Sequence, residues 1–351
     1  MQNHKMSSPN DAAYQALLVV SFGGPERPED VMPFLENVTR GRNTPRERLL
    51  EVAQHYHHFG GKSPINDQCR ALIAALEAEL ERFGPPLPIY WGNRNWHPFL
   101  KDALQQMKSD GVQRALAFVT SAYSSYSGCR QYRENIEQAR HAAGEAAPQV
   151  DKLRVFYNHP HFIQPSAGRL REALSRFPAE QKIHVIFTAH SVPLSLAETS
   201  DYQKQLEETA RLVAEQSGVE HWKLVFQSRS GPPGQPWLEP DILDHLRNIR
   251  SLGIRQVVVA PIGFISDHME IIYDLDIEAK DLAIELGITL VRAGTVGTHP
   301  VFIRMIRELI EERFDPAKPK LAIGRYGPYH DVCAADCCPA PARPALLRSK
   351  Q

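Results

Sequence analysis

The sequence has few cysteines, almost no net charge and no long apolar run. Of its 351 residues only 5 are Cys, and 40 Lys and Arg nearly balance 41 Asp and Glu, for a net charge of -1. This balance excludes a bulk attraction for nucleic acid. No apolar run approaches the ~18 residues of a membrane span, and the polar N-terminal residues do not resemble a secretory signal. We therefore expect a cytoplasmic protein with no integral membrane segment, whose cysteines are thiols or metal ligands rather than disulfides.

The sequence does contain a regular alternation of short apolar runs and helical patterns. Runs typical of buried strands lie at 16–22, 88–92, 115–120, 153–157, 183–187, 223–226, 257–261 and 288–291. Helical patterns separate them, the clearest at 66–83, 131–143, 165–177, 202–216, 269–286 and 301–312. This alternation predicts an α/β protein of two Rossmann-like domains, each a parallel sheet flanked by helices. We expect a disordered lead at 1–13, domains at 14–165 and 166–314, and an extended tail at 315–351.

The first strand ends in a glycine turn, Gly23-Gly24-Pro25, followed by the start of a helix. The order of strand, glycine turn and helix resembles a phosphate-binding turn. Neither the G-x-G-x-x-G nor the Walker pattern is present, however, and this argues against a nucleotide-dependent enzyme.

A histidine follows the strand predicted at 183–187. The segment Thr188-Ala189-His190-Ser191-Val192-Pro193 places His190 at the carboxyl end of that strand, which is the edge where open α/β sheets bind ligands. Imidazole titrates near neutrality and either accepts a proton or binds a metal. A histidine at a strand end is also often structural, and the pattern alone leaves both interpretations open.

A row of carboxylates follows the strand predicted at 257–261. Glu270, Asp274 and Glu278 are spaced by four residues, which spreads them over about 80° of an ideal helix. An apolar stripe occupies the opposite face, as in any solvent-exposed acidic helix. Because like charges at this spacing repel each other, the row is equally typical of a path for divalent cations or protons.

Side chains suited to a carboxylate ligand gather in the first half of the chain. Arg40 and Arg42 come first, and guanidinium groups bind carboxylates bidentately. The segment 121–132 is rich in hydroxyl and aromatic groups, which suits the wall of a site for a flat ligand with polar edges. The alternatives are a solvent-exposed basic loop and a Ser-rich turn.

Three of the five cysteines lie in the tail. Cys333, Cys337 and Cys338 are one thiol short of a set of four. Zinc motifs usually use a C-x-x-C pair, whereas an iron–sulfur cluster takes four thiolates. The fourth would come from Cys129, in a polar loop, rather than from Cys69, which lies on an apolar helical stripe and is better explained as a core thiol. The alternative is a disordered tail with idle thiols.

Taken together, these motifs resemble the ferrochelatase family, specifically its actinobacterial type, over residues 14–338. The similarity is carried by Ser21-Phe22-Gly23-Gly24-Pro25, Arg40-Gly41-Arg42, Gly60-Gly61-Lys62-Ser63-Pro64, the segment 188–193 around His190, Gln227-Ser228, Pro236-Trp237-Leu238, and 261–270 ending in Asp267-His268-Met269-Glu270. The resemblance implies a chelatase-like fold that inserts ferrous iron (Fe2+) into a porphyrin held between two Rossmann-like domains.

The resemblance also implies the roles of individual residues. His190 and Glu270 would be the catalytic pair, facing each other across the macrocycle and contacting the metal. Asp274 and Glu278 would belong to an acidic ladder for metal entry or proton exit, and Phe22 would lie over the porphyrin.

The actinobacterial type implies two further features. One is a two-iron two-sulfur cluster bound by Cys129, Cys333, Cys337 and Cys338. The other is coproporphyrin III as the substrate, with coproheme passing to a downstream decarboxylase. The four propionates of coproporphyrin III would find partners in Arg40, Arg42, Ser63, Tyr123, Tyr126 and Tyr132.

Several alternatives stay open at this point. They are a protoporphyrin IX ferrochelatase, a chelatase for another tetrapyrrole such as sirohydrochlorin, and a non-catalytic porphyrin or heme carrier or iron–sulfur sensor. The chain also departs from the family at two places. Phe22 stands where many bacterial members have Tyr, so its ring can stack but cannot bind a metal. Asn95 stands where some relatives have His, and His97 lies nearby.

Overall fold

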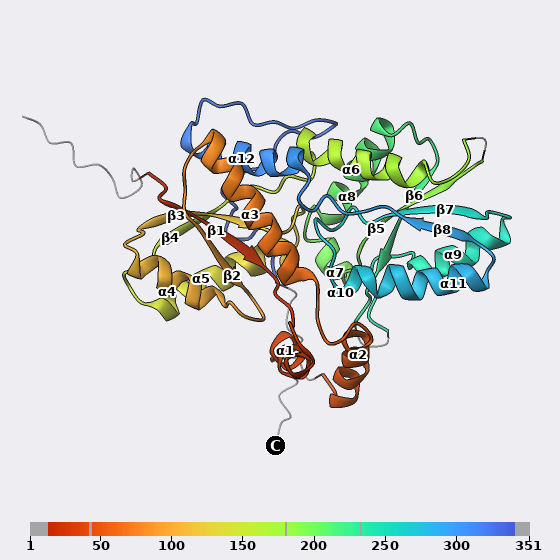
Figure 1. Cartoon of the computed structure of the whole chain (residues 1–351), viewed down its shortest axis with the longest axis horizontal. Coiled ribbons are helices and arrows are strands. Elements are labelled where there is room, and N and C mark those ends of the chain that lie inside the picture. The colour runs from red at the N-terminus through yellow and green to blue at the C-terminus, as the bar shows by residue number, and fades with distance from the viewer. Residues whose placement is uncertain (1–12, 42–43, 180, 232–233, 341–351) are drawn as a thin grey trace, which may run out of the picture.

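Two parallel four-stranded sheets form the framework of the protein (Figure 1). The computed structural model describes residues 13–41, 44–179, 181–231 and 234–340. The first sheet has the order β2 (Ile89–Asn93), β1 (Ala16–Ser21), β3 (Arg114–Val119) and β4 (Gln149–Lys152). The second has the order β6 (Trp222–Gln227), β5 (His184–His190), β7 (Gln256–Ala260) and β8 (Thr289–Arg292). The predicted α/β fold of two Rossmann-like domains is confirmed.

Helices follow nearly every strand. In the first half they are α1 (Val31–Val38), α2 (Arg46–His58), α3 (Ile65–Phe83), α4 (Leu100–Ser109), α5 (Gln131–Ala143) and α6 (Pro160–Leu174). In the second half they are α7 (Leu194–Ala197), α8 (Tyr202–Gln216), α9 (Ile242–Ser251), α10 (Met269–Ile272), α11 (Ala279–Glu285) and α12 (Pro300–Phe314). Short turns complete the set: η2 (Pro28–Asp30) is a 3-10 turn, and η3 (Tyr126–Arg130) and η4 (Asp274–Glu278) are π-turns. None of the described helices is both long and apolar enough to cross a membrane.

The side chains of each strand are divided between two cores. In β1, Leu17 and Val19 point into a central core that also contains β5 residues such as Phe187. Leu18 and Val20 point the other way, into a layer covered by α4 and α5. A strand buried on both faces has to be apolar throughout, which is why these strands are continuous apolar runs in the sequence. The central core joins the two sheets into one body.

Three elements differ from the sequence-based expectation. The fourth strand lies at 149–152, not 153–157, because the apolar residues after it pack between helices, with Phe156 against Phe162 and Phe302 at 5.5 and 5.9 Å between ring centroids. The helix expected from Pro165 begins at Pro160, so α6 runs through the predicted domain boundary at 165. The region taken for a basic loop contains α2, which buries only Leu49 and Ala53 and therefore has little apolar pattern.

The last helix returns to the first half of the chain. α12 packs against both α3 and α6 (Figure 1). Its Glu312 accepts two hydrogen bonds from Arg154, at 2.8 and 2.9 Å, and the two side chains are 2% and 1% exposed. A bidentate pair with this burial needs both partners, because a single buried charge is costly.

Replacing Arg154 by Met should lower the free energy of unfolding by about 3–5 kcal/mol, because it leaves Glu312 buried without its counter-charge. Urea unfolding followed by circular dichroism measures this loss. Arg247→Ala, which breaks the exposed pair with Asp244 at 3.0 Å, is the control and should cost less than about 1 kcal/mol. Equal losses in the two variants would contradict a structural role for the buried pair.

Candidate active site

The two central strands of the second sheet bring the predicted pair together. His190 is the last residue of β5, and Glu270 lies in α10, which follows neighbouring β7. The loop after β7 folds back over β5 at Gly263, whose amide donates to the Thr188 carbonyl at 3.0 Å. A Cβ at this glycine would lie 2.5 Å from Ala189 Cβ. Only glycine allows this close approach, and the approach directs the following residues over His190.

His190 and Glu270 form an ion pair. His190 Nε2 lies 3.4 Å from Glu270 Oε1, and the side chains are 31% and 46% exposed. The other ring nitrogen, Nδ1, faces the Ser191 carbonyl. Both nitrogens therefore have acceptors, an arrangement that favours the protonated ring. Tyr202 donates to the His190 carbonyl at 3.0 Å and Gln227 donates to the Glu270 carbonyl at 2.6 Å, so both backbones are held in place.

The pair shifts the pKa values of both members. Burial acts against the charged imidazole, but the Glu270 carboxylate outweighs it and raises the pKa of His190 to about 9. Burial likewise acts against the carboxylate, but the charge of His190 lowers the pKa of Glu270 to about 2. At neutral pH the resting pair is therefore imidazolium and carboxylate.

Asp274 lies beyond Glu270 and has a raised pKa. Burial first, and then the charges of Glu270 and Glu278, raise the pKa of Asp274 to about 7, although the Ser228 hydroxyl that donates to it acts in the opposite direction. Ser228 adopts a positive φ of 62° just after β6, a conformation uncommon outside glycine. A carboxyl group that is half protonated at neutral pH can both accept and release a proton.

The carboxylates in and near η4 fall into two sets, one paired with an arginine and one without such a pair. In this π-turn the Glu278 amide donates to the carbonyl of Tyr273, five residues earlier, at 3.0 Å. The turn is wider than that of an α-helix, so its side chains point in different directions from those of a regular α-helix. Arg292 of β8 pairs with Asp276 at 2.7 Å and with Asp267 at 3.1 Å. No ion pair with Lys or Arg is present for Asp274 or Glu278 among the residues that the structure describes. One set of carboxylates is thus neutralised and the other is not.

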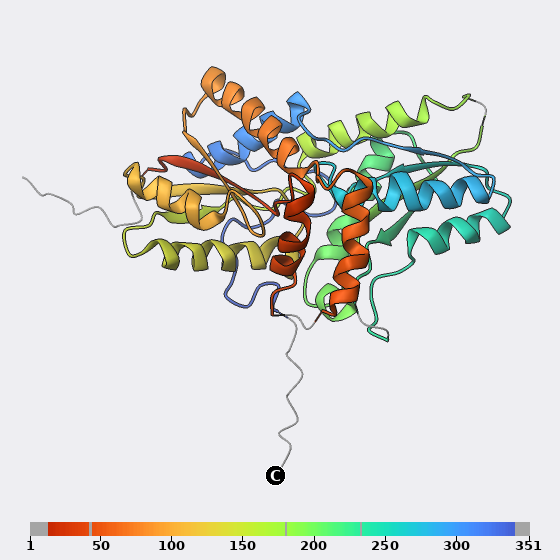
Figure 2. The ribbon, with the colours of Figure 1, turned by 60° about the horizontal axis from the view of Figure 1, so that its bottom comes forward.

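An aromatic layer from the first half flanks the site. α1 and α2 lie across the junction of the two sheets (Figure 2). His55 of α2 stacks on Tyr273 with ring centroids 3.6 Å apart. Burial, and then the charges of Glu270 and Asp274, raise the pKa of Tyr56. Phe22 packs edge-on against Phe34 at 6.2 Å.

Sequence reasoning assigned no role to Tyr56, Tyr202, Gln227 or Ser228. Gln227 and Ser228 follow β6, and the strand-end rule that found His190 could have found them as well. Tyr56 and Tyr202 lie within helices, where nothing in the local pattern marks them.

The residues expected to bind propionates differ in exposure and in the partners of their side chains. Arg40 is exposed and has no side-chain partner among the described residues, whereas Arg42 falls outside them. Tyr126 is partly exposed and donates to Glu134 at 3.3 Å. Arg94 lies over the rings of Tyr132 and Phe22, at 4.5 and 5.7 Å.

Three of the expected ligands are buried, namely Tyr132, beneath Arg94, and the pair Tyr123 and Ser63. Tyr123 is in the central core and its hydroxyl donates to the Ile262 carbonyl at 2.7 Å, so it connects the two halves of the chain. The Ser63 hydroxyl is also buried and accepts from the Ile65 amide at 3.4 Å. Both groups have partners within the protein.

Asn95 and His97 lie on different sides of their loop. The Asn95 amide donates to the Phe22 carbonyl at 3.2 Å, so Asn95 lies beside Phe22. His97 is exposed and packs on Phe99, with ring centroids 4.4 Å apart.

The four cysteines predicted as cluster ligands lie together. Cys129 is buried in η3, and the neighbouring thiol of Cys333 lowers the pKa of Cys129. The Sγ atoms of Cys337 and Cys338 are 3.7 Å apart. Ligand atoms of Cys333, Cys337 and His330 all lie within 4.8 Å of one another. Cys69, by contrast, is buried in α3 as predicted.

Two arginines next to Cys129 hold the cysteine-bearing tail. Arg130 donates to the carbonyls of Ala335 and Cys337, at 2.9 and 3.1 Å. Arg133 donates to the Cys333 carbonyl at 3.4 Å. These contacts place the tail on η3 and α5 of the first half.

Comparison with known proteins identifies the family of the chain. The chain matches the profile of the family described as ferrochelatase over residues 14–314. It is 56% identical over 338 residues to a ferrochelatase of Rhodopirellula baltica, an alignment that covers 95% of this chain and 96% of that protein. It is 52% identical over 347 residues to a coproporphyrin III ferrochelatase of Nocardia farcinica, covering 95% of this chain and 99% of the relative.

Among solved structures, SirB from Bacillus subtilis with Fe3+ aligns with a TM-score of 0.53 and 13% identity, over 86% of this chain and 98% of that chain. At this identity the likeness concerns the fold alone. The profile match and the curated relatives establish that the chain belongs to the ferrochelatase family of metal chelatases.

Proposed function

We propose that the protein inserts ferrous iron into coproporphyrin III at the His190–Glu270 site. The observation that carries this proposal is an imidazole–carboxylate pair next to a carboxyl group, Asp274, whose pKa is raised to about 7. Relatives about 50% identical to this chain act on coproporphyrin III by name, which supports the choice of substrate. The product, coproheme, would be the substrate of a decarboxylase that acts on its propionates.

The reaction requires proton acceptors beside the macrocycle. A free porphyrin carries two inner N–H protons, and both leave when a divalent metal enters. In the resting site His190 is protonated, so it must lose its proton before its nitrogen can bind iron or accept a proton from a pyrrole. The carboxylate of Glu270 lies 3.4 Å from Nε2, and Asp274 comes next in the row.

The uncompensated carboxylates give that proton a route. Asp274 exchanges protons readily at neutral pH, because its pKa lies near 7. Burial raises the pKa of Glu278 as well, which also favours proton uptake at the far end of the row. The same carboxylates would attract ferrous iron, which oxygen ligands accept. We therefore assign His190 and Glu270 to catalysis, and Asp274 and Glu278 to the path that leads from them.

The substrate would be held by the first half of the chain. Phe22 and the aromatic layer around it offer a flat apolar surface to the macrocycle. Arg40 and Tyr126 are accessible to propionates, and Arg42 belongs to the same proposal from sequence alone. Tyr123, Tyr132 and Ser63 are buried, so we assign them to supporting the wall of the site rather than to direct contact.

We also propose that Cys129, Cys333, Cys337 and Cys338 bind a two-iron two-sulfur cluster. The donor set fits, because four thiols from two distant parts of the chain converge and the tail is held there by Arg130 and Arg133. Four thiolates are the usual ligands of such a cluster. When bound, the cluster would supply one-electron redox chemistry and link the tail covalently to the first half.

Replacing His190 by Ala should lower the rate of iron insertion by about 10²–10⁴-fold, because it removes the group that takes protons and meets the metal. Porphyrin binding should remain, since Phe22 and its neighbours are unchanged. The assay follows the loss of free-porphyrin fluorescence anaerobically with ferrous iron. His141→Ala, at a histidine whose side chain is 80% exposed on α5, is the control. Retained iron insertion in His190→Ala would overturn the assignment.

The same assay discriminates between substrates when coproporphyrin III and protoporphyrin IX are run in parallel. Faster turnover of coproporphyrin III is the expected result. A preference for protoporphyrin IX would keep the chelatase activity and reject the substrate, and binding without turnover of either would favour a porphyrin carrier.

Replacing Glu270 by Gln should lower the pKa of His190 from about 9 to its ordinary value or below it, since the opposing charge is gone and burial then dominates. In the wild type the imidazole should lose its proton only as the pH rises through about 9. In the variant it should be neutral throughout the range above about pH 6.5. NMR titration of labelled histidine measures both values, with Glu137→Gln as the control. An unchanged His190 pKa would show that Glu270 does not hold the proton.

Changing Cys337 to Ser should abolish the visible absorption of a two-iron two-sulfur cluster in protein purified anaerobically, because one of four ligands is lost. Cys69→Ser, at the buried thiol of α3, should keep that absorption and the iron and sulfide content of the wild type. A wild-type protein without iron and sulfide, or a Cys337→Ser variant that retains both, would refute the ligand assignment.

A further inference from the structure

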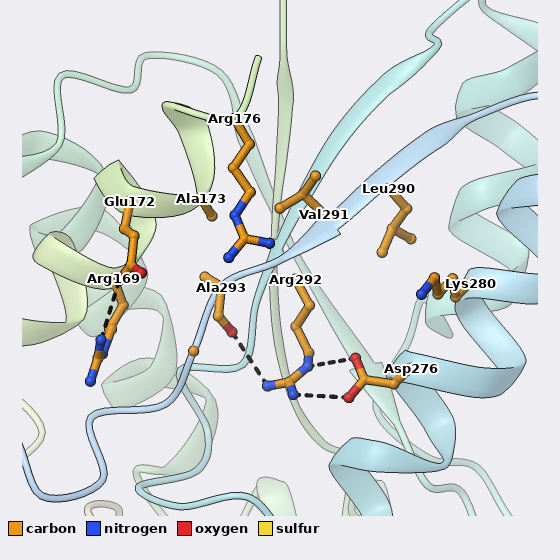
Figure 3. A pocket seen from close by; sticks show the side chains of 11 residues that line it. Arg169, Glu172, Ala173, Arg176, Asp276, Lys280, Leu290, Val291, Arg292 and Ala293 are labelled. Atoms are coloured by element: carbon orange, nitrogen blue, oxygen red, sulfur yellow. Dashed lines mark hydrogen bonds and ion pairs between the residues drawn. The ribbon is translucent and has the colours of Figure 1, made fainter.

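A cavity of about 420 Å³ lies at the outer edge of the second sheet, apart from the His190–Glu270 site (Figure 3). α6 and the segment of η4 and α11 form its two sides, and the edge strand β8 runs between them. This volume is within the range of small-molecule sites, about 300–1,000 Å³. The cavity is built from segments more than a hundred residues apart in the chain, so it is a feature of the folded protein and not of one loop.

The lining of the cavity is cationic. Four basic side chains contribute to it, namely Arg169, Arg176, Lys280 and Arg292, against two carboxylates, Glu172 and Asp276. The carboxylates are already engaged, Glu172 with Arg169 at 3.2 Å and Asp276 with Arg292 at 2.7 Å. Four positive and two negative groups leave an excess of two positive charges.

That excess belongs to Arg176 and Lys280. Neither side chain has a hydrogen bond or ion pair within the described parts of the chain. Arg176 reaches toward β8 from the turn after α6, and Lys280 comes from α11 on the other side (Figure 3). Two unpaired cations that line the same cavity repel each other, and an anion placed with them would relieve this repulsion.

The edge strand supplies neutral donors as well. The amides of Thr289 and Ala293 donate to carbonyls of the β7 side, at 2.7 and 2.8 Å. Residues between them alternate in direction, so Leu290 and Arg292 turn their backbone groups toward the open edge. Backbone N–H groups together with guanidinium forks form the usual surroundings of a bound oxyanion.

We propose that this cavity binds a small polyanion of the phosphate-ester or polycarboxylate class, with its charge between Arg176 and Lys280. The ligand would accept hydrogen bonds from the guanidinium of Arg176, the ammonium of Lys280 and the open edge of β8. The excess of two positive charges matches a dianion or trianion. The inference does not depend on the chelatase activity, because it rests on the charges and geometry of a separate cavity.

Isothermal titration calorimetry tests the proposal. The affinity of the full chain is measured for inorganic pyrophosphate and, separately, for citrate, at constant ionic strength. Saturable one-to-one binding of either probe is expected, and the stronger probe identifies the class. The double variant Arg176→Gln/Lys280→Gln should weaken binding by about tenfold or more, since two charge-assisted contacts are lost. Glu172→Gln, which adds one net positive charge, should strengthen binding.

The matched control is Lys223→Gln, at an exposed lysine of β6, the opposite edge strand of the same sheet. It should leave the affinity within about twofold, because surface charges elsewhere contribute little. Circular dichroism verifies that each variant is folded. Absence of saturable binding with both probes, or an affinity that the double variant leaves unchanged, would overturn the proposal.

Discussion

The ion pair between His190 and Glu270 sets the charge of everything around it. Burial, and then the charge that Glu270 keeps opposite the imidazolium, raise the pKa of Asp274 to about 7. Burial, and then the same negative charge, raise the pKa of the tyrosine hydroxyls of Tyr56 and Tyr202. The site therefore contains neighbouring side chains whose pKa values are low, near neutral and high. Such a range of pKa values allows one site to accept and release protons at neutral pH.

Sequence reasoning located the pair because a simple geometric rule connects sequence to position. The carboxyl ends of parallel strands meet at one edge, so residues that follow two apolar runs, such as His190 and Glu270, are brought together. The strands and most helices were predictable for a similar reason, since burial imposes an apolar pattern. No comparable pattern marks the π-turn η4, the positive φ of Ser228 or the approach of Tyr56 from α2. Those features depend on tertiary contacts. The prediction of a strand at 153–157 was wrong because an apolar run indicates that residues are buried, but not that their backbone pairs with a neighbouring strand.

The π-turn separates two kinds of carboxylate. On one side Arg292 neutralises Asp276 and Asp267, and Arg292 and Asp276 line the basic cavity. Asp274 and Glu278 have no ion pair with Lys or Arg in the described part of the chain, and they continue the row from Glu270. An uninterrupted acidic helix would have spread the same charges around its surface with mutual repulsion. Pairing half of them from a neighbouring strand lowers that repulsion and leaves the unpaired carboxylates next to the site.

α12 is the last helix of the chain, yet it covers α3 of the first half and closes the buried pair with Arg154. The first sheet therefore lacks part of its central cover until almost the whole chain has left the ribosome. A nascent chain that stops before residue 300 exposes the apolar face of α3 and leaves Arg154 buried without its counter-charge. Domains commonly fold one after another during synthesis, but here the first half cannot reach its final stability alone. The two halves of this enzyme consequently depend on the same last helix, and a truncation that removes α12 would uncover α3 of the N-terminal half as well as α6.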